Sequence, residues 1–319
     1  LILVCTMNNI TNAQNPFYGQ YHTPHEAVPF DRIETEHYEP AILEGIKLQN
    51  AEIEAIIQNP EKADFTNTIE AFEESGKLLD KVVAVFGNML SAETNDDLQE
   101  LAQKIMPLLS EHSNNITLNE KLFARVKEVY NQKETLQLTQ EQKQLLENAY
   151  NSFIRHGANL EGEAREEYRR LTTELSKLTL TFSENNLKET NAYQMLLTKK
   201  ESLAGLPEII IEAAAETAKN EEKEGWAFTL HAPSYIPFMT YSDNRDLRQK
   251  LYMAYNTKCT HDNEFNNIDI VKKIANTRMK IAQLLGYKDY AEYTLKKRMA
   301  ENSKSVYKPV SYTHLRAHE

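Results

Sequence analysis

Apolar residues recur at steps of three and four positions through most of this chain, and no other sequence feature constrains the fold as strongly. Such steps place side chains on one face of an α-helix. One stripe runs through residues 69–90, about six turns of helix, with Gly76 inside it as the expected point of a close helix contact. The same stepping recurs in residues 98–112 and 122–129, after a helix over residues 40–57. Four consecutive helices predict a bundle.

The next two helices are bounded by residues with recognisable roles at helix ends. Thr139 followed by Gln142 has the spacing of a capping box, in which two side chains satisfy backbone donors left free at a helix start. Gly157 is expected to end that helix. A further helix places the apolar residues of 171–182 on one side and dense Glu, Arg and Lys on the other.

The pattern changes to alternation around residues 192–198 and again around 226–230, which predicts two short strands. The strands flank a helix that begins near Pro207. Two final helices, over residues 247–255 and 268–285, end with Gly286 at the position of a C-cap. We therefore predict a mainly α fold, a multi-helix bundle with a small β element.

The charge and the length of the apolar stretches argue against a nucleic acid partner and against a membrane span. The net charge is −11, and no cluster of Lys and Arg rises above the helix-surface background, so the chain has nothing with which to neutralise a phosphate backbone. We expect no nucleic acid partner. No stretch after the first residues approaches the roughly 20 apolar residues that cross a bilayer, so we expect no membrane span.

The two ends of the chain differ from the rest. The opening LILVCTMNNITNAQNPF resembles the tail of a signal peptide with a small-residue cleavage site at Thr11 and Ala13, which predicts a periplasmic or otherwise exported protein. Alternatively, Met7 is the true start and the protein is cytoplasmic. Residues 1–14 are expected to be a remnant of the signal, residues 15–307 a helical region, and residues 308–319 an aberrant tail.

A search for a hydrolytic zinc site finds no complete motif. The H-E-x-x-H motif places two His one helical turn apart, with a Glu between them that activates a bound water. His25-Glu26 begins such a string, but Pro29 stands where the second His is needed. His22 and His25 pair at i,i+3, although exposed loop histidines are the simpler interpretation.

Two other candidate sites are equally incomplete. His314 and His318 are four apart, but the segment around them lacks the preceding helical periodicity. Cys259 and His261 have no orienting partner at a recognisable spacing, and we interpret them as solvated loop residues. Cys5 is too distant from Cys259 in sequence to indicate a metal site. We therefore predict no catalytic residue and no metal ligand, and substrate-binding residues remain unknown.

The segment HAPSYIPFMTYSDNRDLRQKLYMAYNTKC, residues 231–259, closely resembles a signature stretch of the thimet oligopeptidase, neurolysin and bacterial peptidyl-dipeptidase family. Further blocks resemble the same family in the same order: PFDRIETEHYEPAI, FTNTIEAFEESGKLLDKVVAVFGNMLSAETND, FIRHGANL, LAGLPE and LLGYKDYAEYTLKKRMA. Together they span nearly everything from Pro29 to about Tyr307, and bacterial peptidyl-dipeptidases are the most similar branch.

The resemblance implies the amino-terminal part of a two-lobed, mostly α-helical oligopeptidase whose channel admits short peptides. In that family the zinc motif and a third ligand, a Glu, lie downstream of the blocks seen here. The parent protein is thus expected to be a zinc peptidase and a monomer, with short peptides as substrates. This chain is expected to hold no zinc and to be inactive. The alternative is an exported helical module that binds peptides or proteins without cutting them.

The signature block also contains residues with two possible roles. Asn244, Arg245, Asp246 and Arg248 are suited to line a peptide channel, where Arg binds a carboxylate with two hydrogen bonds. The structural interpretation, which we favour, is a helix start at Ser242 or Asp243 with Asp246 near the positive end of the helix dipole. An aromatic group upstream is expected to form a packed corner between a strand and a helix: Tyr235, Pro237, Phe238 and Tyr241.

Overall fold

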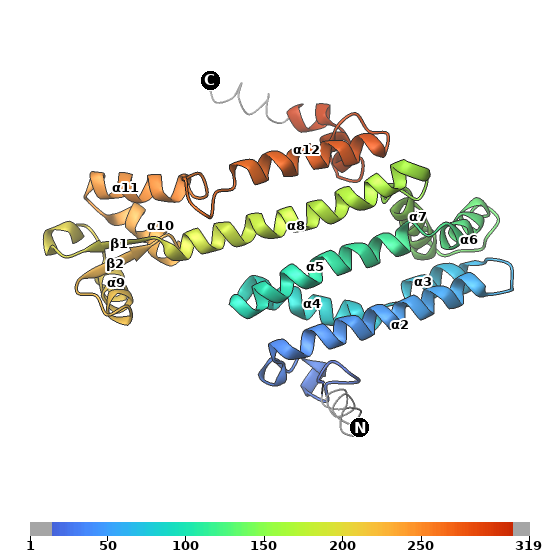
Figure 1. Ribbon diagram of the computed structural model, residues 1–319, viewed down its shortest axis with the longest axis horizontal. Helices are drawn as coiled ribbons and strands as arrows, with labels where there is room; N and C mark the ends of the chain where they lie inside the picture. Colours follow the sequence, from blue (N-terminus) through green and yellow to red (C-terminus); the bar gives the residue numbers. More distant parts are fainter. Residues whose placement is uncertain (1–14, 309–319) are drawn as a thin grey trace, which may run out of the picture. The chain divides into compact units, whose positions relative to one another are not determined.

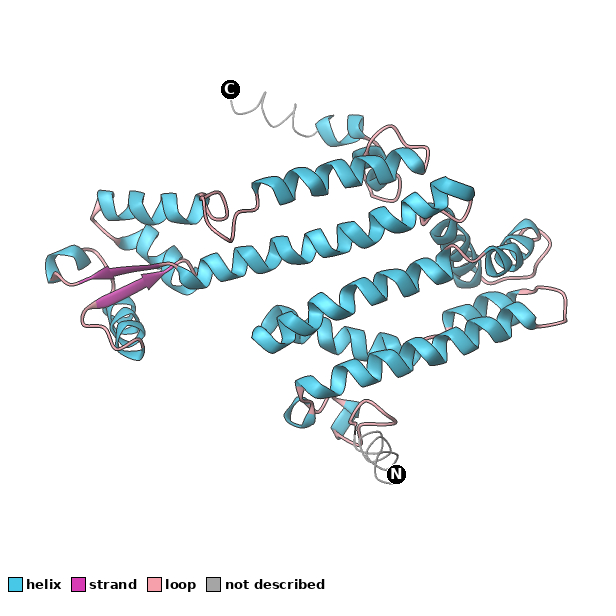
Figure 2. Ribbon diagram, in the orientation of Figure 1, coloured by secondary structure: helices cyan, strands magenta, loops and turns pink. Residues whose placement is uncertain are grey.

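The computed structural model describes residues 15–308 and is mainly α-helical, with one two-stranded sheet among these residues (Figures 1 and 2). The described residues divide into two compact units. Unit 1 comprises residues 15–177 and 277–308, and unit 2 comprises residues 178–276. The boundaries between the units fall inside two helices, α8 and α12. The predicted fold class is confirmed. The predicted signal remnant, residues 1–14, and the predicted tail, residues 308–319 apart from Lys308, lie outside the described residues.

Unit 1 is built from helices that follow one another along the chain. Three short 3₁₀ turns come first: Pro24–Glu26, Phe30–Arg32 and Thr35–His37. The helices are α2 (Tyr38–Gln58), α3 (Ala71–Glu73), α4 (Lys77–Ala92), α5 (Asp96–Thr117), α6 (Glu120–Asn131), α7 (Gln140–Arg155), the first half of α8 (Gly162–Ala192), the last part of α12 (Ile268–Leu284) and α13 (Tyr290–Leu295). A π-helical segment, Phe65–Glu70, precedes α3.

The crossing of α2 and α4 depends on a glycine. A Cβ added at Gly45 would lie 2.9 Å from the Cα of Leu79, so only glycine allows the two backbones to approach this closely. The close helix contact predicted at Gly76 is also present, since a Cβ added there would lie 2.3 Å from the side chain of Gln49 on α2. The prediction that one continuous helix runs through Gly76 was wrong. Gly76 has φ +80°, a left-handed conformation that ends the segment containing α3 and provides the N-cap of α4.

The core of unit 1 is mostly aliphatic and aromatic. The largest cluster lies where α6 and α7 meet α2 and the π-helical segment, and Leu122, Val126 and Leu146 are fully buried in it. A second cluster joins α8 to α12 through Tyr168, Leu171 and Ile281. The capping box at the start of α7 is confirmed, since Thr139 and Gln142 exchange hydrogen bonds with each other's backbone N–H groups at 3.3 and 3.0 Å.

Unit 2 contains the sheet, and both strands were predicted. β1 (Gln194–Leu197) pairs antiparallel with β2 (Trp226–Thr229), with Met195 opposite Phe228. Between the strands lie a short 3₁₀ turn, Lys200–Leu203, and α9 (Glu208–Asn220), which starts after Pro207 as predicted. After β2 come α10 (Ala232–Tyr241) and α11 (Arg245–Asn256). The core gathers residues from every one of these elements: Met195, Leu203, Ala214, Phe228, Phe238 and Leu251.

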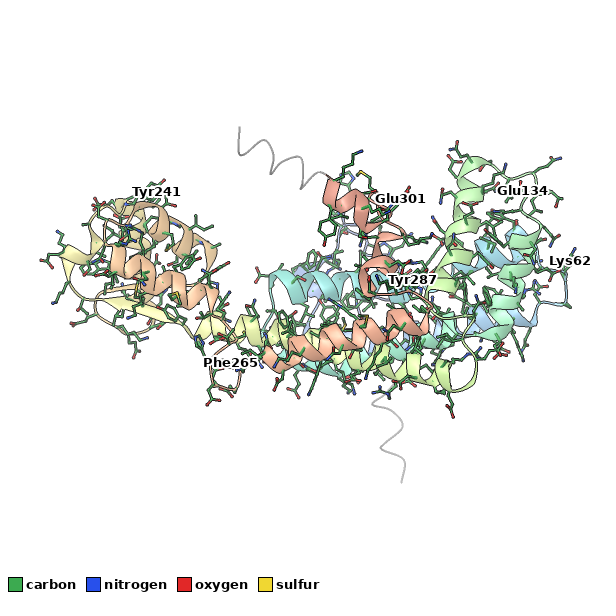
Figure 3. The ribbon with its side chains drawn as sticks, turned by 90° about the horizontal axis from the view of Figure 1, so that it is seen from above. Lys62, Glu134, Tyr241, Phe265, Tyr287 and Glu301 are labelled. Atoms are coloured by element: carbon green, nitrogen blue, oxygen red, sulfur yellow. The ribbon has the colours of Figure 1, made fainter. Side chains whose placement is uncertain are left out.

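The sequence predicted a packed corner between a strand and a helix in this region, but the structure has a helix here, α10. Proline stands at the first turn of α10, where its missing N–H costs nothing, and a second proline, Pro237, lies inside the helix. These two prolines are the reason that the sequence did not indicate a helix here. Phe238 does pack as expected, with its ring 4.6 Å from that of Phe228, whereas Tyr241 is 52% exposed and lies at the surface of unit 2 (Figure 3).

Candidate functional site

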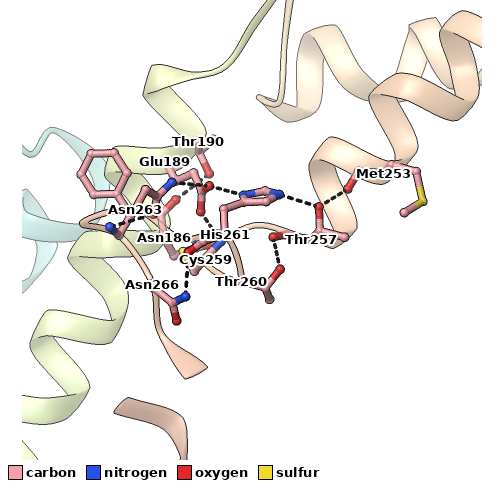
Figure 4. Close-up of polar contacts among 11 residues, drawn as sticks. Asn186, Glu189, Thr190, Met253, Thr257, Cys259, Thr260, His261, Asn263 and Asn266 are labelled. Carbon is pink, nitrogen blue, oxygen red and sulfur yellow. Dashed lines mark hydrogen bonds and ion pairs between the residues drawn. The ribbon is translucent and has the colours of Figure 1, made fainter. Parts of the chain in front are cut away.

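A thiol, an imidazole and a carboxylate come together in unit 2, at the loop that follows α11. Glu189, near the end of α8, is 9% exposed, and the loop residues Cys259, His261 and Asn263 surround it (Figure 4). These residue types occur together in enzymes that attack carbonyl groups with a thiolate. We therefore consider this group, the Glu189 network, as the first candidate site.

The carboxylate of Glu189 accepts three hydrogen bonds from the loop. The backbone N–H of Cys259 donates to Oε2, whereas His261 Nδ1 and Asn263 Nδ2 donate to Oε1 at 2.7 and 3.2 Å (Figure 4). On the other side of the imidazole ring, Nε2 lies 3.2 Å from Thr257 Oγ1. One buried acidic side chain of α8 thus accepts hydrogen bonds from three residues of the loop.

The backbone of the loop has a conformation that needs this support. Cys259 has φ +59°, in the left-handed region that is uncommon for residues with a side chain. Its carbonyl oxygen accepts a hydrogen bond from Asn267 N at 2.8 Å, and Asn266 Nδ2 donates to the carbonyl oxygen of His261 at 2.6 Å. Asn267 also donates to the carbonyl oxygen of Phe182, at 2.9 Å, and so joins the end of the loop to α8.

The electrostatics of the network oppose thiol chemistry. Burial raises the pKa of the Cys259 thiol to about 11, and the neighbouring Glu189 carboxylate adds to the rise, so the thiol stays protonated at neutral pH. Burial alone would raise the pKa of Glu189, but hydrogen bonds from His261, Cys259 and Asn263 outweigh it and lower that pKa below its ordinary value. Glu189 is therefore ionised, and the network stabilises the loop rather than activating a nucleophile.

The prediction for Cys259 and His261 was partly wrong. Cys259 is 5% exposed and buried, not solvated, whereas half of the His261 side chain is exposed. His261 does have an orienting partner, Glu189, but 72 residues separate the two, so no local spacing in the sequence indicates the pair. The predicted absence of a catalytic thiol stays a prediction.

Asn244 and Arg248 of the signature block have structural contacts in unit 2. Asn244, not Ser242 or Asp243, is the N-cap of α11, and its side chain accepts a hydrogen bond from Leu247 N at 3.1 Å. Asp246 lies in the first turn of α11, as predicted.

Arg248 stabilises the same helix start. Its Nη1 donates to the carbonyl oxygen of Ser242, the residue that ends α10. The structural interpretation therefore explains the contacts of Asn244 and Arg248 without a substrate.

The other candidate histidines do not form a site in the described chain. His22 and His25 are exposed, and both have positive φ, +55° and +59°. His314 and His318 lie outside the described residues. Within residues 15–308, no group of three or more His, Cys, Asp and Glu side chains is arranged to hold a metal ion, so the described residues do not fit the zinc that the family implies. None of the helices described is long and apolar enough to span a membrane.

Comparison with known proteins agrees with the ordered blocks. The profile of peptidase family M3 matches residues 238–317. Dipeptidyl carboxypeptidase of Escherichia coli is 35% identical over 293 residues, and oligopeptidase A of Salmonella typhimurium is 30% identical over 296 residues. Each alignment covers 92% of this chain but 43% of the relative. A probable cytosolic oligopeptidase A of Arabidopsis thaliana is 27% identical over 92% of this chain.

The chain thus spans less than half the length of the curated relatives that it matches. Two lines of similarity point to the same family. One is the family profile over residues 238–317, and the other is the identity of 30–35% to curated relatives over most of the chain. The resemblance of this chain to the peptidases of family M3 is confirmed.

Proposed function

We propose that this chain is the helical amino-terminal part of an M3-type zinc metallopeptidase, and that the complete protein hydrolyses short peptides. The observation that carries the proposal is identity of 30–35% to a dipeptidyl carboxypeptidase and an oligopeptidase A over 92% of the chain. Similarity this extended does not arise from a single short motif. The mainly α-helical fold with its small sheet is consistent with the proposal.

We propose further that the 319-residue chain has no peptidase activity alone. Hydrolysis of a peptide bond needs an activated water or a nucleophile. The described residues do not fit zinc, and the pKa of the Cys259 thiol, about 11, keeps that sulfur protonated. On this proposal, residues beyond those described in the complete protein supply the metal ligands, and no catalytic step is assigned to a residue described here.

In this scheme the described chain contributes shape and rigidity. The Glu189 network fixes the loop between α11 and α12, and the Asn244 and Arg248 contacts fix the start of α11. Rigid supporting elements of this kind are what a binding channel requires, since positioning errors of about 1 Å can reduce catalysis strongly. Removal of dipeptides and cleavage within oligopeptides both remain within the proposal, because relatives with both names match.

The proposal is tested by recovering a longer reading frame from the source DNA and expressing its complete product. The expected frame continues past Tyr307 and encodes H-E-x-x-H. The expected product cleaves a quenched fluorescent peptide, and a chelator abolishes the cleavage. A frame that continues without that motif, or a complete product that leaves the peptide intact, would contradict the proposal.

Export and a monomeric state are two further parts of the proposal, both based on the sequence. Cell fractionation of the source organism, followed by amino-terminal sequencing, tests export: the expected mature protein starts close to Ala13 and is found outside the cytoplasm. Light scattering of the complete protein tests the monomer, and a stable dimer would contradict it.

A further inference from the structure

Unit 1 contains a cavity that the proposed peptidase function does not use. It has a volume of about 310 Å³ and lies among α2, α4 and α5, three helices that pack against one another (Figure 1). This volume is near the lower end of the range for small-molecule sites, roughly 300 to 1,000 Å³. Its apolar lining comes from Phe72, Leu79, Val83, Leu109 and Ile116.

A buried histidine, His112, is among the residues that line this cavity. His112 is 6% exposed, and its Nε2 lies 2.7 Å from the Oε1 of Gln49. Because an amide oxygen only accepts, Nε2 carries the proton and donates. Burial lowers the pKa of His112, so the ring is neutral at pH 7 and Nδ1 has a free lone pair. Within residues 15–308, Nδ1 has no hydrogen-bond partner.

A carboxylate stands at the exposed side of the same cavity. Asp80 is exposed and forms no ion pair with any residue of the described chain. The two lysines beside it on α4 are engaged elsewhere: Lys77 pairs with Glu74, and Lys81 donates to the carbonyl oxygen of Gly19 at 2.7 Å. The negative charge of Asp80 is thus available to a cation that arrives from solvent.

We propose that this cavity binds an arylalkylamine whose ring carries a hydrogen-bond donor. The apolar walls would hold the aromatic ring, His112 Nδ1 would accept from the ring donor, and Asp80 would pair with the ammonium group. An uncharged apolar ligand would leave Asp80 unused, and an anion would be repelled by it. The site is independent of peptide hydrolysis, because its lining residues all belong to α2, α4, α5 and the segment before α4.

Titration calorimetry of the 319-residue chain with tyramine, phenethylamine and p-cresol tests both polar contacts. Phenethylamine lacks the hydroxyl and p-cresol lacks the amine. Loss of the hydrogen bond is expected to weaken binding about threefold to tenfold. Loss of the surface ion pair is expected to weaken it about twofold to fivefold. Equal affinity for all three probes, or no saturable binding of tyramine at millimolar concentration, would overturn the proposal.

Variants separate this cavity from non-specific binding. Val83→Phe and, independently, Leu109→Phe should fill the cavity and abolish tyramine binding, whereas Leu48→Phe, at an exposed position of α2 outside the lining, should preserve it. Asp80→Asn should lower the affinity for tyramine but not for p-cresol, with Glu111→Gln on α5 as the matched control. Circular dichroism identifies any variant that fails to fold. Unchanged tyramine binding in both folded filling variants would contradict the proposal.

Discussion

Two regions of this molecule hold their segments together by different means. In unit 1, α7 packs against α6 and α3 through aromatic rings: the ring centroid of Phe153 lies 5.7 Å from that of Phe123 on α6 and 5.4 Å from that of Phe72 on α3. In unit 2, the loop after α11 is held by directional hydrogen bonds, three of which converge on the carboxylate of Glu189. Dispersion contacts are individually weak and numerous, whereas charge-assisted hydrogen bonds are few and directional. A substitution therefore acts through a cavity in the first region and through unpaired donors in the second.

The largest effect is expected from removing a ring in unit 1. Phe153 is 1% exposed, so Phe153→Ala should lower the free energy of unfolding by about 3–5 kcal/mol, through lost burial and the cavity left behind. Urea denaturation followed by circular dichroism measures the loss. Phe30→Ala is the control, because Phe30 is 54% exposed. A loss for Phe153→Ala no larger than that for the control would show that the aromatic packing is not the source of stability.

A smaller effect is expected from Glu189→Gln. The amide retains one acceptor oxygen but directs an NH₂ group at donors of the loop, so stability should fall by about 1–3 kcal/mol. Hydrogen exchange should show faster exchange of the Cys259 amide. Glu212→Gln, an exposed position on α9, is the matched control. Unchanged protection of the Cys259 amide would mean that the loop does not depend on the Glu189 network.

The capping box of α7 provides a comparison on a smaller scale. Thr139→Ala removes the hydroxyl that accepts from Gln142 N and should lower the free energy of unfolding by about 1 kcal/mol. Thr139→Ser keeps the hydroxyl and should retain most of the stability. Denaturant midpoints of the three proteins measure the difference, and equal losses in both variants would assign the effect to packing instead of capping.

The smallest expected effect is the pH-dependent part of the contribution that Glu189 makes to the free energy of unfolding. Because the pKa of Glu189 is lowered in the folded state, its contribution is fully present above the unfolded carboxyl pKa of about 4.3 and is lost as pH falls through the folded pKa. The free energy of unfolding of the wild type and of Glu189→Gln should therefore converge as the pH is lowered from 6 into the acid range. Parallel curves would show that the charge of Glu189 adds nothing.

The sequence predicted the parts of the fold that depend on local periodicity. Helices α2, α5, α6 and α7 and both strands lie where the apolar spacing indicated. The break at Gly76 was missed because the apolar stripe continues across it, so the spacing carries no sign of the left-handed residue. Helix α10 was missed because Pro237 lies in its interior, where proline normally argues against a helix.

The sites were harder to predict than the elements. The partner of His261 is 72 residues away in the sequence, and Gln49 and His112 are 63 residues apart. Side chains this distant meet only when the helices that carry them pack, and one sequence contains no local sign of such a pair. The N-cap at Asn244 was predicted to within two residues, since capping uses only neighbouring positions.

The most direct measurement is the zinc content of the purified 319-residue chain by elemental analysis, paired with hydrolysis of a quenched fluorescent peptide. If the chain is the non-catalytic helical part of an M3-type peptidase, less than stoichiometric zinc will be found and the peptide will remain intact. One zinc per chain with cleavage that a chelator abolishes would contradict this account, and His314 and His318 would then be the first residues to replace.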